Sequence, residues 1–123
     1  MELVQKQAQI EQLAEEILGD RQLRINYDRR RHELQEALAL FRRGKVEDKV
    51  WLHTGGLFVK SRQDEAKETI QQDLRMINEE ISRCDDSIRT KTIQLEEAEN
   101  ESHRIKGFNL KGISTKEVFK IKH

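Results

Sequence analysis

The 123-residue chain contains no proline, a single cysteine and only 5% aromatic residues. Without proline, no residue interrupts a long helix by removing a backbone donor. The lone Cys84 cannot form an internal disulfide, which is consistent with a reducing compartment. Few aromatic residues beside a charged fraction of 37% leave little apolar volume for a globular core. We therefore expect one elongated domain.

An excess of charge of either sign is also lacking, because 23 Lys and Arg balance 23 Asp and Glu. No net field attracts nucleic acid or an anionic membrane. No apolar run approaches the ~18 residues of a membrane-spanning helix, and the first residues lack the pattern of a signal peptide. These absences predict a cytosolic protein and leave the nucleus open as a second location.

Apolar residues recur in each half of the chain at alternating steps of three and four, with some positions skipped, a pattern that favours stable coiled-coil helix over disorder. The first seam consists of Leu3, Ile10, Leu13, Ile17, Tyr27, Leu34, Leu38 and Phe41. The second consists of Ile70, Leu74, Ile77, Ile81, Cys84, Ile88, Lys91, Leu95, Ala98, Ser102 and Ile105. We predict helices over 1–43, ended by Gly44, and over 62–106. They are expected to pair antiparallel, because the connection keeps them close.

Charged residues occupy core-type positions of both seams: Asp20, Arg24 and Arg31 on the first and Lys91 on the second. A buried charge costs stability unless it is paired, but it can set the register of a coiled coil. Folding the chain about Gly55 brings Asp20 within about one layer of Lys91. We predict that these two residues interact as a register pair. The alternative is that both side chains reach past the seam into solvent.

The stretch VWLHTGGLFVK (Val50–Lys60) interrupts the heptads with residues that favour strands, on both sides of a turn at Thr54, Gly55 and Gly56. It predicts a β-hairpin over 46–60 that joins the helices. Because a lone apolar hairpin has two open edges, we expect it to join strands of other chains. The alternative is packing on its own coiled coil. The predicted assembly residues are Val50, Trp51, Leu52, Gly55, Gly56, Leu57, Phe58 and Val59.

The order helix, single hairpin, helix, together with GGLFVKSRQDEAKETIQQDL from Gly55 to Leu74, resembles the β-class subunits of prefoldin. LAEEIL before Asp20, DRRRHELQEAL from Asp28 and KGFNL from Lys106 resemble the prefoldin-like subunits of the unconventional prefoldin complex. The resemblance implies a mainly α, β-type prefoldin fold: an antiparallel two-helix coiled coil joined by a central β-hairpin.

This resemblance also implies a non-enzymatic co-chaperone subunit that binds no cofactor. Its implied partners are other prefoldin or prefoldin-like subunits in a hetero-hexamer, unfolded client proteins and an AAA ATPase co-chaperone complex. The bodies of such hexamers are made of hairpins, and their coiled coils hang free. A coiled-coil scaffold or homodimer without clients remains the alternative.

If the hairpin forms the body, the other ends of the two helices form a tip that would present apolar side chains to clients. The predicted tip residues are Leu3, Val4, Ile10, Ile105 and Phe108. Ordinary fraying of helix ends accounts for the same residues equally well. After Gly107, the spacing of Ser114 and Glu117 predicts a short helix in the tail over 107–123. Its apolar side, Val118, Phe119 and Ile121, is expected to dock on the coiled coil or on a partner.

Signals for chemistry are sparse. The four histidines are widely separated, so no metal site is expected, and TGGLF lacks the Lys-Ser/Thr end of a phosphate loop. DRRRH (Asp28–His32) is the one compact basic cluster and raises nucleic-acid binding as a rival function. Three arginines on a neutral coiled coil are more typical of a solvated face.

Overall fold

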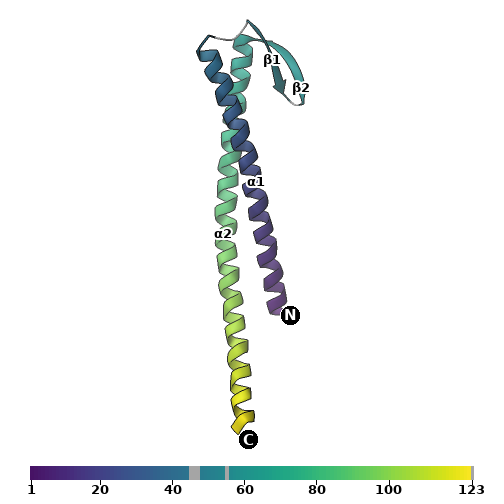
Figure 1. The fold of residues 1–123 in the computed structure, drawn as a ribbon, viewed down its shortest axis with the longest axis vertical. Coiled ribbons are helices and arrows are strands. Elements are labelled where there is room, and N and C mark those ends of the chain that lie inside the picture. Colours follow the sequence, from purple (N-terminus) through teal and green to yellow (C-terminus); the bar gives the residue numbers. More distant parts are fainter. Residues whose placement is uncertain (45–47, 55, 123) are drawn as a thin grey trace. The chain divides into compact units, whose positions relative to one another are not determined.

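Two long helices flank a two-stranded antiparallel sheet in the computed structural model (Figure 1). It describes the backbone of residues 1–44, 48–54 and 56–122, and their side chains apart from 53–54 and 110–122. The elements are α1 (Glu2–Arg42), β1 (Lys49–Thr54), β2 (Leu57–Arg62) and α2 (Gln63–Lys122). The predicted mainly α fold with a central hairpin is confirmed.

The contacts divide the chain into two compact units. Unit 1 comprises Met1–Arg21 and Asp86–His123, and unit 2 comprises Gln22–Asp85 with the hairpin. In each unit, cross-helix contacts run in opposite directions along the two helices: Lys6–Glu101 and Asp20–Lys91 in unit 1, and Arg24–Asp85 and Arg31–Asn78 in unit 2. Each unit is therefore an antiparallel helix pair.

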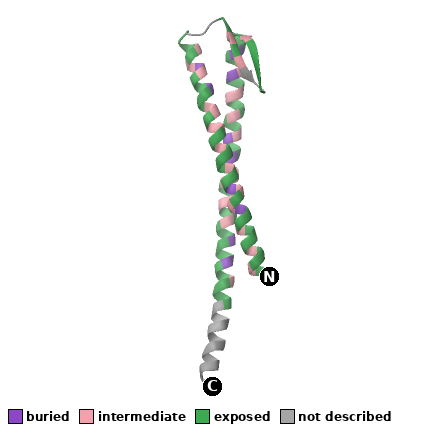
Figure 2. Cartoon of the chain, turned by 45° about the vertical axis from the view of Figure 1, so that its right-hand side comes forward, coloured by how far each residue is buried: buried purple, intermediate pink, exposed green. Residues whose placement is uncertain are grey.

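The residues of both predicted seams are all buried or half-buried. In Figure 2 the buried (purple) and half-buried (pink) residues alternate with exposed (green) residues along the two helices. In unit 2 a core forms from Leu34 and Leu38 of α1 and Ile70 of α2. Leu52 of β1 packs against this core. The hairpin is thus held to the helices through Leu52, within β1. Ala66, which the seam pattern omits, is fully buried.

The end of α1 follows the prediction closely. Gly44 takes a φ of +65°, a left-handed conformation that an L side chain rarely adopts. Its amide donates to the carbonyl of Phe41 at 3.2 Å, and the amide of Arg43 donates to Ala39 at 3.1 Å. These bonds satisfy carbonyl groups that would otherwise remain free at a helix end.

The second strand of the hairpin continues to Arg62, beyond the end of the predicted range of 46–60. Strand pairing continues to Lys49 and Arg62, and α2 begins directly at Gln63, whose amide donates to the carbonyl of Asp48 at 2.9 Å. This bond satisfies one of the free donors at the start of a helix. Residues 45–47 and the predicted turn residue Gly55 lie outside the described residues.

The structure differs from the prediction at Gly107, where α2 continues to Lys122 instead of giving way to a separate short helix. One glycine inside a helix costs only about 1 kcal/mol, which the surrounding helix formers can offset. The predicted docking of Val118, Phe119 and Ile121 concerns side chains outside the described residues.

Two leucines in the last turns of α1 provide a matched test of the seam. Leu38 is 6% exposed and belongs to the core cluster, whereas Leu40 is 47% exposed. We expect Leu38→Ala to lower the free energy of unfolding by about 2–4 kcal/mol, because it leaves a cavity. Leu40→Ala should cost less than about 1 kcal/mol. Chemical denaturation followed by circular dichroism measures the free energy of unfolding of both variants. Equal losses of stability would contradict the assignment of Leu38, and not Leu40, to the buried seam.

Candidate functional site

The strand register divides the hairpin into two faces of different chemistry. Trp51 lies opposite Lys60, Leu52 opposite Val59 and Val50 opposite Ser61. Because side chains alternate along a strand and cross-strand partners share a face, two sets result. The apolar face carries Val50, Leu52, Leu57, Val59 and Ser61. The aromatic–cationic face carries Lys49, Trp51, Phe58, Lys60 and Arg62.

Both faces expose apolar side chains. On the apolar face Val50 and Leu52 are half-buried, whereas Leu57 and Val59 are 69% and 44% exposed. On the other face Trp51 and Phe58 are 67% and 71% exposed. Lys60 Nζ lies 5.9 Å from the centre of the Trp51 ring, within cation–π range. The helices of unit 2 therefore partly cover the β1 side of the apolar face, through Leu52, and leave the start of β2 exposed, as the green colour of that strand in Figure 2 shows.

The sheet also leaves backbone groups available. β1 and β2 form a two-stranded sheet, and no further strand among the described residues covers either outer edge. An open edge offers unpaired amides and carbonyls to another strand. Gly56, with a φ of +80°, makes the tight turn between the strands. The predicted assembly residues thus lie together on one exposed element, except Gly55, which is outside the described residues.

The register pair forms the centre of a polar cluster in unit 1. Ser87 Oγ donates to Asp20 Oδ2 at 2.7 Å, and Lys91 Nζ donates to the same oxygen at 3.0 Å. The side chains of Asp20 and Lys91 are only 22% and 27% exposed. These hydrogen bonds, first from Ser87 and then from Lys91, hold the pKa of Asp20 below its ordinary value of 3.8. The structure thus brings the predicted pair together and adds Ser87, which the seam pattern had not indicated.

Unit 2 has its own polar positions on the seam. Arg24 Nε lies 2.5 Å from Asp85 Oδ1, and this hydrogen bond raises the pKa of Arg24. Arg31 pairs with Asp28 one turn earlier and donates to Asn78 Oδ1 at 3.5 Å. The sequence identified both arginines as charged seam residues but gave no partners. Asp85 follows the seam residue Cys84 directly, and this position at the seam's edge is the signal that could have identified it.

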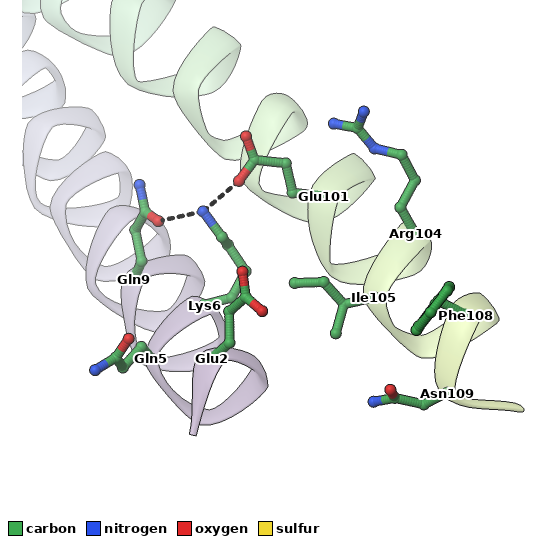
Figure 3. A pocket seen from close by; sticks show the side chains of 9 residues that line it. All are labelled: Glu2, Gln5, Lys6, Gln9, Glu101, Arg104, Ile105, Phe108 and Asn109. Carbon is green, nitrogen blue, oxygen red and sulfur yellow. Dashed lines mark hydrogen bonds and ion pairs between the residues drawn. The ribbon is translucent and has the colours of Figure 1, made fainter. Parts of the chain in front are cut away.

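Most of the predicted tip residues do not line the groove that the structure has in unit 1 (Figure 3). This groove of about 970 Å³ lies between the first turns of α1 and a late part of α2. Ile105 and Phe108 line it, beside charged side chains from both helices (Figure 3). Val4 is exposed elsewhere, and Leu3 and Ile10 are half-buried. The tip surface is therefore more polar than predicted.

Lys6 is the residue of this groove that sequence reasoning missed. Its Nζ donates to Gln9 Oε1 at 3.1 Å and forms an ion pair with Glu101 across the groove (Figure 3). The hydrogen bond from Lys6 to Glu101, together with the charge of Lys6, lowers the pKa of Glu101. Lys6 falls on the seam, three residues after Leu3 and four before Ile10, so the heptad spacing itself carried the signal.

The basic cluster at Asp28–His32 is largely neutralised by its own neighbours. Arg31 pairs with Asp28, and Arg30 pairs with Glu33 at 3.3 Å. His32 Nε2 lies 3.6 Å from the second oxygen of Asp28. In the part of the chain that the structure describes, no three His, Cys, Asp or Glu side chains converge as a metal site requires. Nor does any described helix combine the length and apolar character needed to span a bilayer.

The hairpin between two antiparallel helices is matched by a known family. The sequence profile described as "Prefoldin subunit" covers residues 2–106. The chain belongs to the prefoldin subunit family. This family is of the chaperone type and is not enzymatic, so a co-chaperone role in general follows from membership. The match begins with α1 and includes the whole hairpin.

Several mammalian proteins named "p53 and DNA damage-regulated protein 1" are similar to this prefoldin-family chain. The mouse protein is 33% identical over 115 residues, covering 93% of this chain and 86% of the relative. The human protein is 30% identical over the same lengths, and the rat protein 32% identical over 111 residues. The resemblance to prefoldin-like subunits in the sequence is thereby confirmed. No solved structure gives a significant match.

A double-mutant cycle at Asp20 and Lys91 measures whether the pair stabilises this prefoldin-family coiled coil. We expect Asp20→Asn and Lys91→Met to show a coupling free energy of about 1 kcal/mol at neutral pH, because both groups are three-quarters shielded. Asp86 and Arg89, an exposed pair on α2 with atoms 3.4 Å apart, provide the control. Their coupling should stay below about 0.5 kcal/mol.

The coupling free energy between Asp20 and Lys91 should depend on pH, and the lowered pKa of Asp20 sets the direction of this dependence. The folded pKa of Asp20 lies below its unfolded value, so the pair stabilises the fold fully above about pH 4. The coupling should disappear as the pH falls through the lowered pKa and the carboxylate is protonated. Denaturation of the four proteins at neutral pH and at about pH 2 measures the difference. A coupling that persists in acid would show that the carboxylate charge is not responsible.

Proposed function

We propose that this prefoldin-family subunit assembles through its β-hairpin into a hetero-oligomer of prefoldin-like subunits. In that assembly it helps to hold or deliver unfolded or unassembled client proteins. The observation that carries the proposal is the hairpin itself, which exposes apolar side chains on both faces and has open edges. Family membership supports an association with other prefoldin-like subunits.

The size of the exposed surface favours assembly over packing within the chain. Covering a large apolar side chain contributes about 1.5–3 kcal/mol. Trp51, Leu57, Phe58 and Val59 are largely exposed, so partner strands that cover them gain several kcal/mol before the costs of association. Of the hairpin's apolar side chains that the structure describes, only Val50 and Leu52 are half-buried. A scaffold without partner strands would leave this surface in water.

Two exposed aromatic residues of the hairpin allow a direct test. We expect Trp51→Ser with Phe58→Ser to reduce incorporation into the endogenous complex at least tenfold, because the hydrophobic contact area is lost. Leu18→Ser with Met76→Ser, two exposed apolar residues on the helices, should have little effect. Native mass spectrometry of complexes purified through the tagged full chain measures incorporation. Circular dichroism checks that both variants keep their helices.

Two outcomes would contradict the assembly proposal. One is that the hairpin variant retains its prefoldin-like subunits as well as the control variant does. The other is that the wild-type chain is recovered only as a monomer or homodimer, which would favour the coiled-coil scaffold instead.

Client binding at the tip is a second part of the proposal, supported by the exposure of Val4 and Phe108 in unit 1. We expect Val4→Ser with Phe108→Ser to weaken the suppression of aggregation of a denatured client by the assembled complex. Leu23→Ser with Leu40→Ser, which also removes two exposed apolar side chains, is the matched control. Light scattering of the client measures the effect, and equal activity of both complexes would exclude the tip.

The AAA ATPase co-chaperone complex is proposed as a further partner, on the resemblance of KGFNL and DRRRHELQEAL to subunits of the unconventional prefoldin complex. The cytosol, with the nucleus as a second location, is proposed from composition. Both depend on sequence alone.

A further inference from the structure

The hairpin has an unusual distribution of charge. Its two strands, KVWLHT and LFVKSR, contain none of the 23 acidic residues of the chain. Their three Lys and Arg residues, Lys49, Lys60 and Arg62, all fall on the aromatic–cationic face by the strand register. The opposite face carries no charged side chain. Any strand that extends this sheet therefore meets two different chemistries on its two sides.

The cations of this face have no carboxylate partner among the described residues. Lys60 contacts the Trp51 ring. Lys49 and Arg62 line a cleft of about 490 Å³ at the base of the hairpin, where Asp48 and Asp64 are also present, but no described ion pair joins them. Lys67 adds a third cation to this cleft. The surface thus has a positive excess that an acidic group could neutralise.

The two strand edges are not equivalent. In β1, Lys49 and Trp51 are exposed but Val50 and Leu52 are half-buried, whereas in β2 every residue except the half-buried Ser61 is exposed. β2 also carries two of the three cations, Lys60 and Arg62, two residues apart on one face. A strand that pairs with the free edge of β2 would place alternate side chains beside these two cations. The edge of β2 is therefore both the more accessible and the more strongly charged.

We propose that the free edge of β2 receives a strand of a neighbouring subunit whose alternate residues are acidic where they face Lys60 and Arg62 and apolar where they face Leu57 and Val59. This inference rests on the proposed assembly through the hairpin and specifies the chemistry of the partner strand. Opposite charges directly across a strand pair stabilise it, and like charges destabilise it. The apolar side supplies affinity, and the charged side selects among otherwise similar apolar strands.

Lysine at a sheet edge also protects against unwanted pairing, because an incoming apolar strand must desolvate it. This protection and the proposed selection act together, since an acidic strand compensates the cations that other strands would leave unpaired. Single-stranded nucleic acid could stack on the aromatic residues of the same face. The open apolar residues Leu57 and Val59 on the opposite side favour a protein strand, which covers both faces at once.

Charge reversal in the native complex tests the inference. We expect Lys60→Glu with Arg62→Glu to reduce the recovery of the neighbouring subunit at least tenfold, measured by native mass spectrometry of complexes purified through the full chain. Lys49→Glu, on the same face but on β1, should reduce it less than threefold. Recovery of the wild-type partner should also fall as salt is raised from about 50 mM to 500 mM, more steeply than for the variant Lys60→Gln with Arg62→Gln.

Crosslinking identifies the partner strand itself. A photoreactive phenylalanine analogue in place of Phe58 lies on the same face as Lys60, so it should crosslink to the strand beside β2. We expect the crosslinked segment to contain Asp or Glu at alternate positions. Replacing those residues with Lys should restore assembly with the Lys60→Glu, Arg62→Glu chain.

The outcomes separate this inference from the proposed function. If the charge-reversed chain keeps its partner while Trp51→Ser with Phe58→Ser loses it, assembly through the hairpin stands and the acidic partner strand is wrong. A crosslinked segment without acidic residues, a nuclease-sensitive crosslink or a failed reciprocal swap would overturn it as well. If the wild-type chain recovers no prefoldin-like subunit, the proposed function fails first.

Discussion

Two narrow apolar seams bury each other, and both the helix pairs and the attachment of the hairpin rest on this contact. With 35% hydrophobic residues, the chain has enough apolar side chains to line one stripe on each helix. Each helix therefore covers the apolar stripe of the other, and this contact holds the helix pair together in both units. Large apolar residues outside the seams are not covered by this contact, and those that cluster on one exposed element require another explanation.

Polar residues on the seams reduce the apolar area that the two helices bury, but they specify how the helices align. Asp20 accepts hydrogen bonds from Ser87 and Lys91, and Arg24 pairs with Asp85. Sliding one helix along the other by a heptad would preserve many apolar contacts but would leave these charges without their partners. A partly shielded charge without a partner is costly, so the polar positions disfavour the alternative registers. Strength and specificity therefore come from different residues of the same surface.

The hairpin follows the opposite rule, because its apolar residues exceed what the helices of its own unit can cover. Leu52 is tied to the core, whereas Trp51, Leu57 and Phe58 remain exposed. An element that is anchored through one side chain of β1 and open at its edges is suited to pair with strands of other subunits. The aromatic–cationic face adds a chemical preference to this general capacity. Membership in the prefoldin subunit family agrees with an element of this kind between two helices.

The helix–hairpin–helix order, both seams and the end of α1 could be predicted from the amino-acid pattern, because they depend on local periodicity and on the backbone freedom of Gly44. It also indicated Asp20 and Lys91 as neighbours, since a hairpin of known centre fixes which layers meet. Three polar contacts could not be predicted and became visible in the folded chain: Ser87 joins this pair, Asp85 pairs with Arg24, and Lys6 crosses to Glu101. Long polar side chains at the edge of a seam can reach several partners, and helix spacing does not choose among them. The division of the hairpin into an apolar and an aromatic–cationic face likewise required the strand register, because a shift of one residue would exchange the two sets.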